Sequence, residues 1–121
     1  MAFTIRTCES PPLLCITMRG FWTMPIFDRY MAECGAAIAG LMRDHGRFDT
    51  IGNCNDFPIQ GPDVAAAFER LKALAAATPD NRIAIITASA LGRMQALRLV
   101  GNAHSRIFAT EAAARAWLGL A

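Results

Sequence analysis

The segment "RIAIITA", residues 82–88, decides how the rest of the chain is interpreted. Its core, Ile83 to Ile86, is uninterrupted by any polar residue, which is typical of a strand buried on both faces of a parallel sheet. The segment "SALGRMQALRLVG", residues 89–101, follows at once, and begins with a serine that can cap a helix and ends with a glycine that can close it. A buried strand that passes directly into a helix predicts an α/β fold.

The same alternation extends in both directions from this unit. Strands are expected at residues 3–8, 13–20, 48–55, 82–88 and 105–109. Helices are expected at residues 23–46, 62–77, 89–101 and 111–121. This order predicts a five-stranded mixed sheet with four helices, mostly parallel, with the first strand antiparallel at the edge. The whole chain, residues 1–121, is predicted to be a single domain.

Crossovers of one hand place successive helices on the same face of a sheet, so we expect most helices on one face. The other face is then expected to carry a mixed surface at its edge, made of Thr4, Arg6, Thr17 and Arg19.

The first two strands should form a hairpin whose register follows from their alternating pattern. The pattern pairs Ile5 with Met18, and sets Cys8 directly opposite Cys15. Pro11 and Pro12 are unfavourable in a two-residue hairpin turn, so the alternative is a wider loop with a shifted register.

Composition limits the classes of function. Hydrophobic residues make up 54% of the chain and charged residues 18%, as in a globular domain. The net charge of +2 is too small to predict nucleic-acid binding. No apolar run reaches the roughly 18 residues of a membrane span, and the N-terminus lacks the basic and apolar regions of a signal peptide. A cytoplasmic protein is therefore expected.

The segment "NDFPIQGPDVAAAFERL", residues 55–71, has the layout of an active-site corner, because Asp56 ends a strand and Gly61 precedes a helix. Asp56 and Asp63 could serve as an acid–base pair or as metal ligands. Alternatively, Asp56 bonds its own turn and Asp63 caps the helix. We favour the structural interpretation, since the segment offers no nucleophile beside the two carboxylates.

Four cysteines, at positions 8, 15, 34 and 54, form no CxxC pair, so neither zinc nor another metal is expected. A catalytic cysteine would need a histidine as its base, and His45 and His104 are assigned to a helix end and a loop. No GxGxxG or P-loop is present, and Ser89 lacks a GxSxG setting. We therefore expect no enzyme and no cofactor. Aromatic residues could line an apolar pocket or simply pack in the core, which we favour: Phe21, Trp22, Phe57 and Trp117.

Three stretches carry a resemblance to a known family: "RGFWT" after the second strand, "NDFP" after the third and "SALGRMQALRL" after the fourth. With the element order, they resemble the SpoIIAA-like (STAS/SEC14-type) proteins of bacteria over nearly the whole chain. The resemblance implies a β-α superhelix with one antiparallel edge strand. It also implies the behaviour of anti-sigma-factor antagonists, which bind a kinase and are phosphorylated at the start of the helix after the third strand.

This chain departs from that switch pattern, because residues 51–77 contain no serine or threonine. The resemblance then implies a non-catalytic protein-interaction module without the phosphoacceptor, which binds an unidentified protein or a second copy of the chain. The alternative that it implies is a SEC14-like carrier of a small apolar ligand or lipid. The candidate interaction surface comprises Asp56, Phe57, Gln60, Gly61, Asp63, Ser89 and Arg93.

Overall fold

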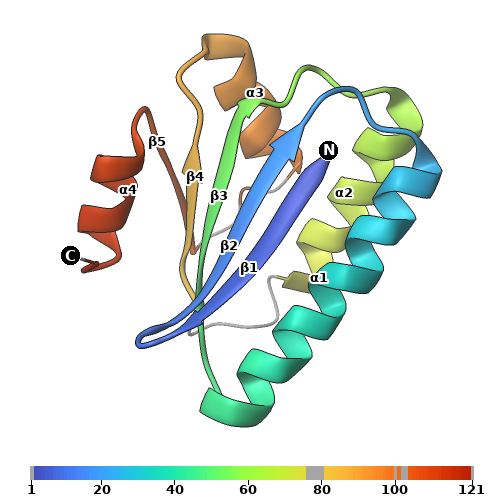
Figure 1. The fold of residues 1–121 in the computed structure, drawn as a ribbon. Helices are drawn as coiled ribbons and strands as arrows, with labels where there is room; N and C mark the ends of the chain where they lie inside the picture. Colours follow the sequence, from blue (N-terminus) through green and yellow to red (C-terminus); the bar gives the residue numbers. More distant parts are fainter. Residues whose placement is uncertain (1, 76–80, 100, 102–103, 121) are drawn as a thin grey trace.

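A computed structural model describes residues 2–75, 81–99, 101 and 104–120. Its elements are β1 (Phe3–Glu9), β2 (Pro12–Arg19), α1 (Met24–His45), β3 (Asp49–Asp56), α2 (Pro62–Ala75), β4 (Ile83–Ile86), α3 (Ala90–Leu99), β5 (Ser105–Phe108) and α4 (Glu111–Trp117). The strands form one sheet in the order β1-β2-β3-β4-β5, antiparallel between β1 and β2 and parallel elsewhere (Figure 1). The predicted α/β fold is confirmed. The last two residues of the helix predicted at 62–77 lie outside the described residues.

Helices cover the two faces of the sheet unequally. Side chains of α1, α2 and α3 share one apolar core with β1, β2 and β3, whereas α4 packs on the opposite face against β3, β4 and β5 (Figure 1). The expectation that most helices share a face therefore holds for the three crossover helices. Helix α4 lies on the other face, because a helix that follows the last strand makes no crossover and can fold to either face. Its packing leaves only β1 and part of β2 open on that face.

Trp22 is the centre of the larger core, with only 1% of its surface exposed. Its ring centroid lies 5.1 Å from that of Tyr30, 5.2 Å from that of Phe57 and 5.7 Å from that of Phe68. Trp117 instead packs on Phe108 across the sheet. The aromatic residues considered for a pocket thus line no common cavity, and Trp22 and Phe57 are core residues.

The hairpin differs from its predicted register by two residues. Phe3 lies opposite Met18, Ile5 opposite Ile16 and Cys8 opposite Leu13. The turn contains only Ser10 and Pro11, joined by a cis peptide bond, as in turns with a cis-proline at their third position. The wider loop expected from the two prolines is therefore wrong, because two residues close the turn. A shift of two residues preserves the facing of every side chain, so Cys8 and Cys15 still share a face.

Helix ends follow the sequence with one exception. The Thr110 hydroxyl accepts a hydrogen bond from the Ala113 N–H at 3.2 Å, and Gly46 ends α1 in the left-handed conformation. Thr23 occupies the N-cap position of α1 with extended backbone, but its side chain makes no cap hydrogen bond. The Thr23 hydroxyl therefore does not cap α1.

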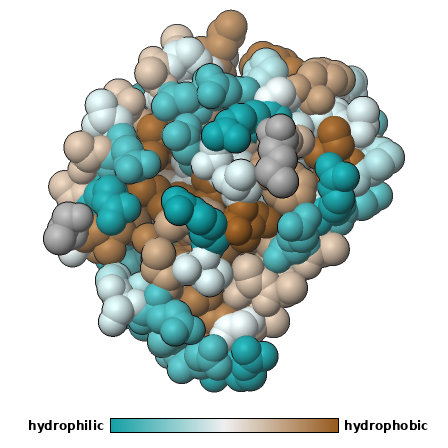
Figure 2. Space-filling view, in the orientation of Figure 1, coloured by the Kyte–Doolittle hydropathy of each residue, from teal (hydrophilic) through white to brown (hydrophobic). Residues whose placement is uncertain are grey.

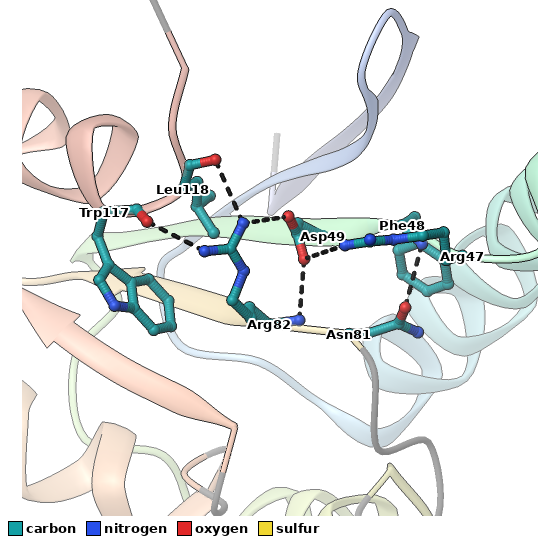
Figure 3. Close-up of polar contacts among 7 residues, drawn as sticks. All are labelled: Arg47, Phe48, Asp49, Asn81, Arg82, Trp117 and Leu118. Atoms are coloured by element: carbon teal, nitrogen blue, oxygen red, sulfur yellow. Dashed lines mark hydrogen bonds and ion pairs between the residues drawn. The ribbon is translucent and has the colours of Figure 1, made fainter.

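Arg82 ties α4 to the sheet (Figure 3). Its guanidinium donates to Asp49 Oδ2 at 2.9 Å and to the carbonyls of Trp117 at 3.1 Å and Leu118 at 3.3 Å. It also lies 5.5 Å from the centroid of the Trp117 ring. A cation at the C-terminal end of a helix satisfies carbonyls that have no partner within the helix, so this one side chain fixes the end of α4 on the sheet.

We expect Arg82→Met to lower the free energy of unfolding by about 1–2 kcal/mol, because it leaves the Asp49 carboxylate and the last carbonyls of α4 without their shared donor. Urea unfolding of the two proteins measures the difference. The control is Arg106→Met, at an exposed position of β5, which should change stability by less than about 0.5 kcal/mol. Equal effects of both substitutions would contradict this role of Arg82.

Candidate functional site

The corner after β3 is organised by a buried amide. Gln60 is 7% exposed. Its Oε1 accepts from the Trp22 N–H at 2.7 Å, and its Nε2 donates to the carbonyls of Gly20 at 3.0 Å and Pro58 at 2.7 Å. One side chain therefore joins the segment after β2 to the segment after β3, and satisfies backbone groups that burial would otherwise leave unpaired.

A second buried amide brings α3 against the same corner. Gln95 Oε1 accepts from the Gln60 N–H at 2.8 Å, and its Nε2 donates to the Pro58 carbonyl at 2.9 Å. Gly92, one turn earlier, allows the close approach, because a Cβ there would lie 2.2 Å from Thr87 Oγ1. The helix therefore turns a small residue and an amide toward the sheet.

The predicted surface residues divide into two groups. Asp56, Asp63, Ser89 and Arg93 are exposed, whereas Phe57 and Gln60 are buried. The surface assignment is therefore wrong for Phe57, which packs on Trp22, and for Gln60, which supports the corner from inside. Both residues were expected at the surface because they lie in the corner after β3. A glutamine gives no local signal in the sequence that it is buried.

The two carboxylates do not act together as a site. The Asp63 carboxylate accepts from the Val64 N–H at 2.8 Å in the first turn of α2, as a structural residue would. Asp56 contributes its backbone carbonyl, which accepts from the Gly20 N–H, and its carboxylate has no hydrogen-bond partner in the part of the chain that the structure describes. The turn hydrogen bond expected of the Asp56 carboxylate is made by two asparagines instead. Asn53 Oδ1 accepts from the Asn55 N–H, and Asn55 Oδ1 accepts from the Ala88 N–H.

The outward face of α3 is apolar, which sequence analysis missed. Leu91 is 65%, Met94 67% and Leu97 57% exposed, while the inward face holds the buried Gln95, Ala96 and Leu99. In Figure 2, hydrophobic atoms reach the surface at the top of the view, where Figure 1 places the first turn of α3. The helix therefore has apolar residues on both faces, and those on the outer face are exposed.

Two further exposed apolar residues extend this face. Ile59 lies between Pro58 and Gln60, both bonded to Gln95, so it is next to α3. Phe21 lies over Gly61, where a Cβ would be 3.2 Å from its ring. We define the docking surface by the exposed hydrophobic residues at this end of the sheet: Phe21, Ile59, Leu91, Met94 and Leu97.

An apolar cavity of about 210 Å³ lies between the sheet and helices α1 and α2. The side chains that surround it include Ile16, Tyr30, Phe68 and Ile85. Five of the lining side chains carry a hydroxyl, a thiol or an ammonium group: Tyr30, Cys34, Thr50, Cys54 and Lys72. The cavity is partly open to solvent, and its lining is mostly apolar.

Two glycines border the cavity, one from each side. Gly52 lies in β3 between Ile16 and Ile85, and Gly35 lies in the middle of α1. A Cβ at either position would meet no atom within 4 Å. Glycine inside a helix or strand costs about 0.5–1 kcal/mol relative to alanine. Steric crowding therefore does not explain why these two positions lack a side chain.

The thiols are suited to packing more than to catalysis. Burial raises the pKa of the Cys54 thiol to about 12, and burial also raises the pKa of the Cys34 thiol. Burial, followed by the neighbouring Cys8, raises the pKa of Cys15. A nucleophilic cysteine needs the opposite shift. In the part of the chain that the structure describes, no group of three or more His, Cys, Asp or Glu residues is placed to hold a metal ion.

Comparison with family models, with curated proteins and with solved structures gave no match. None of the helices within the described residues has the length and apolar character that crossing a membrane requires.

We expect Gln60→Leu to lower the free energy of unfolding by about 2–4 kcal/mol, because it leaves the Trp22 N–H and the Gly20 carbonyl without partners in a buried corner. Chemical denaturation measures this. Asp56→Ala is the matched control in the same corner, and should change stability by less than about 0.5 kcal/mol, since its carboxylate is exposed. A tolerated Gln60→Leu would show that the corner does not depend on this amide.

Cys54 should react slowly with iodoacetamide in the folded protein. At pH 8, raising its pKa from 9.0 to about 12 lowers the thiolate fraction by about a thousandfold. Alkylation followed by mass spectrometry should therefore modify Cys54 far faster in urea than in buffer, and Cys8, which is exposed, should react first in the folded protein. Equal rates for Cys54 in the two conditions would contradict its burial.

Proposed function

We propose that this chain is a non-catalytic protein-interaction domain that binds a protein partner through the docking surface. The observation that carries the proposal is the exposure of three large apolar side chains on the outer face of α3: Leu91, Met94 and Leu97. Gathered apolar side chains on a surface mark interaction sites. A rigid base supports them, because the Gln60–Gln95 network fixes α3 on the corner.

The chemistry of the docking surface indicates the kind of partner. Leu91, Met94 and Leu97 recur every three residues, so they form one stripe that an amphipathic helix of a partner could cover. Methionine adapts its shape to the surface that it contacts. Exposed charges of both signs lie beside the stripe: Arg93 and Arg98 on α3, and Glu69, which pairs with Arg98. The proposed partner therefore presents an apolar ridge with charges at its margin.

The resemblance to SpoIIAA-like proteins supports the same class of function, since it implies a partner-binding bacterial domain of the cytoplasm. The absence of serine and threonine from residues 51–77 leaves the family's switch without an acceptor. We therefore propose binding that phosphorylation at that position does not regulate.

The test is a photo-crosslinking amino acid at Met94, introduced into the full chain in its native cells. The expected result is one discrete adduct, which disappears when Leu91→Gln and Leu97→Gln are added. The matched control carries the same crosslinker at Ala112, which is exposed on α4 at the opposite face of the sheet, and should give no such adduct. Adducts of equal yield from both positions would contradict the proposal.

Once identified, the partner should bind the purified chain directly. We expect the double substitution to weaken that binding at least about tenfold, because truncating apolar residues at the centre of an interface typically has this effect. An adduct with the mass of two chains, together with a dimer in light scattering, would identify a second copy as the partner. A partner bound equally by the double variant would overturn the docking surface.

A further inference from the structure

We propose that the cavity between α1, α2 and the sheet binds a small amphipathic carboxylate, with its apolar body inside and its carboxylate at Lys72. This ligand site does not rest on the proposed protein interaction. It is carried by three observations: the volume and lining of the cavity, the two glycines that leave it open, and the placement of polar donors at one end.

Volume and lining determine what the cavity can hold. An apolar cavity of about 150 Å³ stays dry and admits benzene, and this one measures about 210 Å³. It is lined by aliphatic and aromatic side chains such as Ile16, Ile38, Phe68 and Ile85. Water finds too few hydrogen-bond partners in such a space, so an apolar molecule fits it better.

The glycines indicate that the space is retained. Gly52 faces the cavity between two isoleucines, and a side chain at that position would fill empty volume without a clash. Gly35 borders the cavity from α1, and a Cβ there would also meet no atom within 4 Å. Because Gly35 is exposed, the cavity reaches solvent beside this helix. A glycine within a strand often marks the close approach of a ligand. Here two independent elements leave the same volume free.

The polar donors are not spread evenly around the cavity. Thr50 is the second residue of β3, and Lys72 lies in the last turn of α2. Since α2 returns antiparallel to β3, both residues lie at the same end of the cavity. Lys72 is the cation among the described lining residues, and its Nζ donates to the Leu97 and Arg98 carbonyls at 3.3 and 3.4 Å. An ammonium with two long bonds retains the capacity to bind a carboxylate.

The experiment compares octanoate, octanol and octylamine, which share a chain and differ in the head group. Binding is measured by calorimetry with the purified full chain, and located by methyl NMR of the isoleucines. We expect octanoate to bind with shifts at Ile16 and Ile85, octanol to bind at least about tenfold more weakly, and octylamine to bind weakest, since one charge-assisted hydrogen bond accounts for about that factor.

Variants separate the cavity from the head group. Gly52→Val should abolish binding of octanoate and octanol while keeping or raising Tm, because it fills the cavity with a residue that favours strands. Gly35→Leu provides a second block from α1, in case β3 does not accept valine. Lys72→Met should reduce octanoate to the affinity of octanol, and Lys72→Arg should retain the preference for octanoate. Ala112→Val, on α4, is the control and should bind as the unaltered chain does.

Several outcomes would overturn the site. Absence of isoleucine shifts at saturating octanoate would show that the cavity holds no such ligand. Unchanged octanoate binding in both folded glycine variants would place the ligand elsewhere. Octylamine binding as tightly as octanoate would exclude the carboxylate and its recognition by Lys72.

Discussion

The side-chain amide of Gln60 is the interaction on which the functional end of the molecule depends. It accepts from the Trp22 N–H and donates to the carbonyls of Gly20 and Pro58. It therefore joins the loop after β2 to the loop after β3, which are far apart in the sequence. Trp22 is thereby held where four aromatic rings surround it. An unpaired amide in this position would cost stability, whereas a fully bonded one specifies a single arrangement of the corner.

The arrangement of α3 follows from this amide. Gln95 bonds the Gln60 N–H and the Pro58 carbonyl, and Gly92 brings the helix close to Thr87. With Gln95 and Gly92 turned inward beside Ala96 and Leu99, the side chains of Leu91, Met94 and Leu97 face outward. One orientation of α3 therefore has two results. Its inner face supports the corner, and its outer face exposes Leu91, Met94 and Leu97. This explains how a surface rich in apolar residues can belong to a well-packed domain.

Lys72 links the two proposed sites. Lys72 is one of the residues that line the cavity, and its ammonium bonds the carbonyls of Leu97 and Arg98 in the last turn of α3. Lys72 therefore contacts both α3, which carries the docking surface, and the end of the cavity proposed to bind a carboxylate. At the opposite face, Arg82 fixes α4 by the same type of contact, a cation on the final carbonyls of a helix. Both helix ends are held by side chains from other elements.

The sequence by itself determined the element order, the mixed sheet and its antiparallel edge, because hydrophobic periodicity and capping residues act within a few positions of the chain. It also determined that the corner lacks a phosphoacceptor. Tertiary structure alone decided the register of the hairpin, since one cis bond at Pro11 shortened the loop, and it decided the side on which α4 packs. It likewise buried Gln60 and exposed Leu91. A residue's polarity predicts its burial only when no distant partner, such as Trp22 or Gln95, satisfies it.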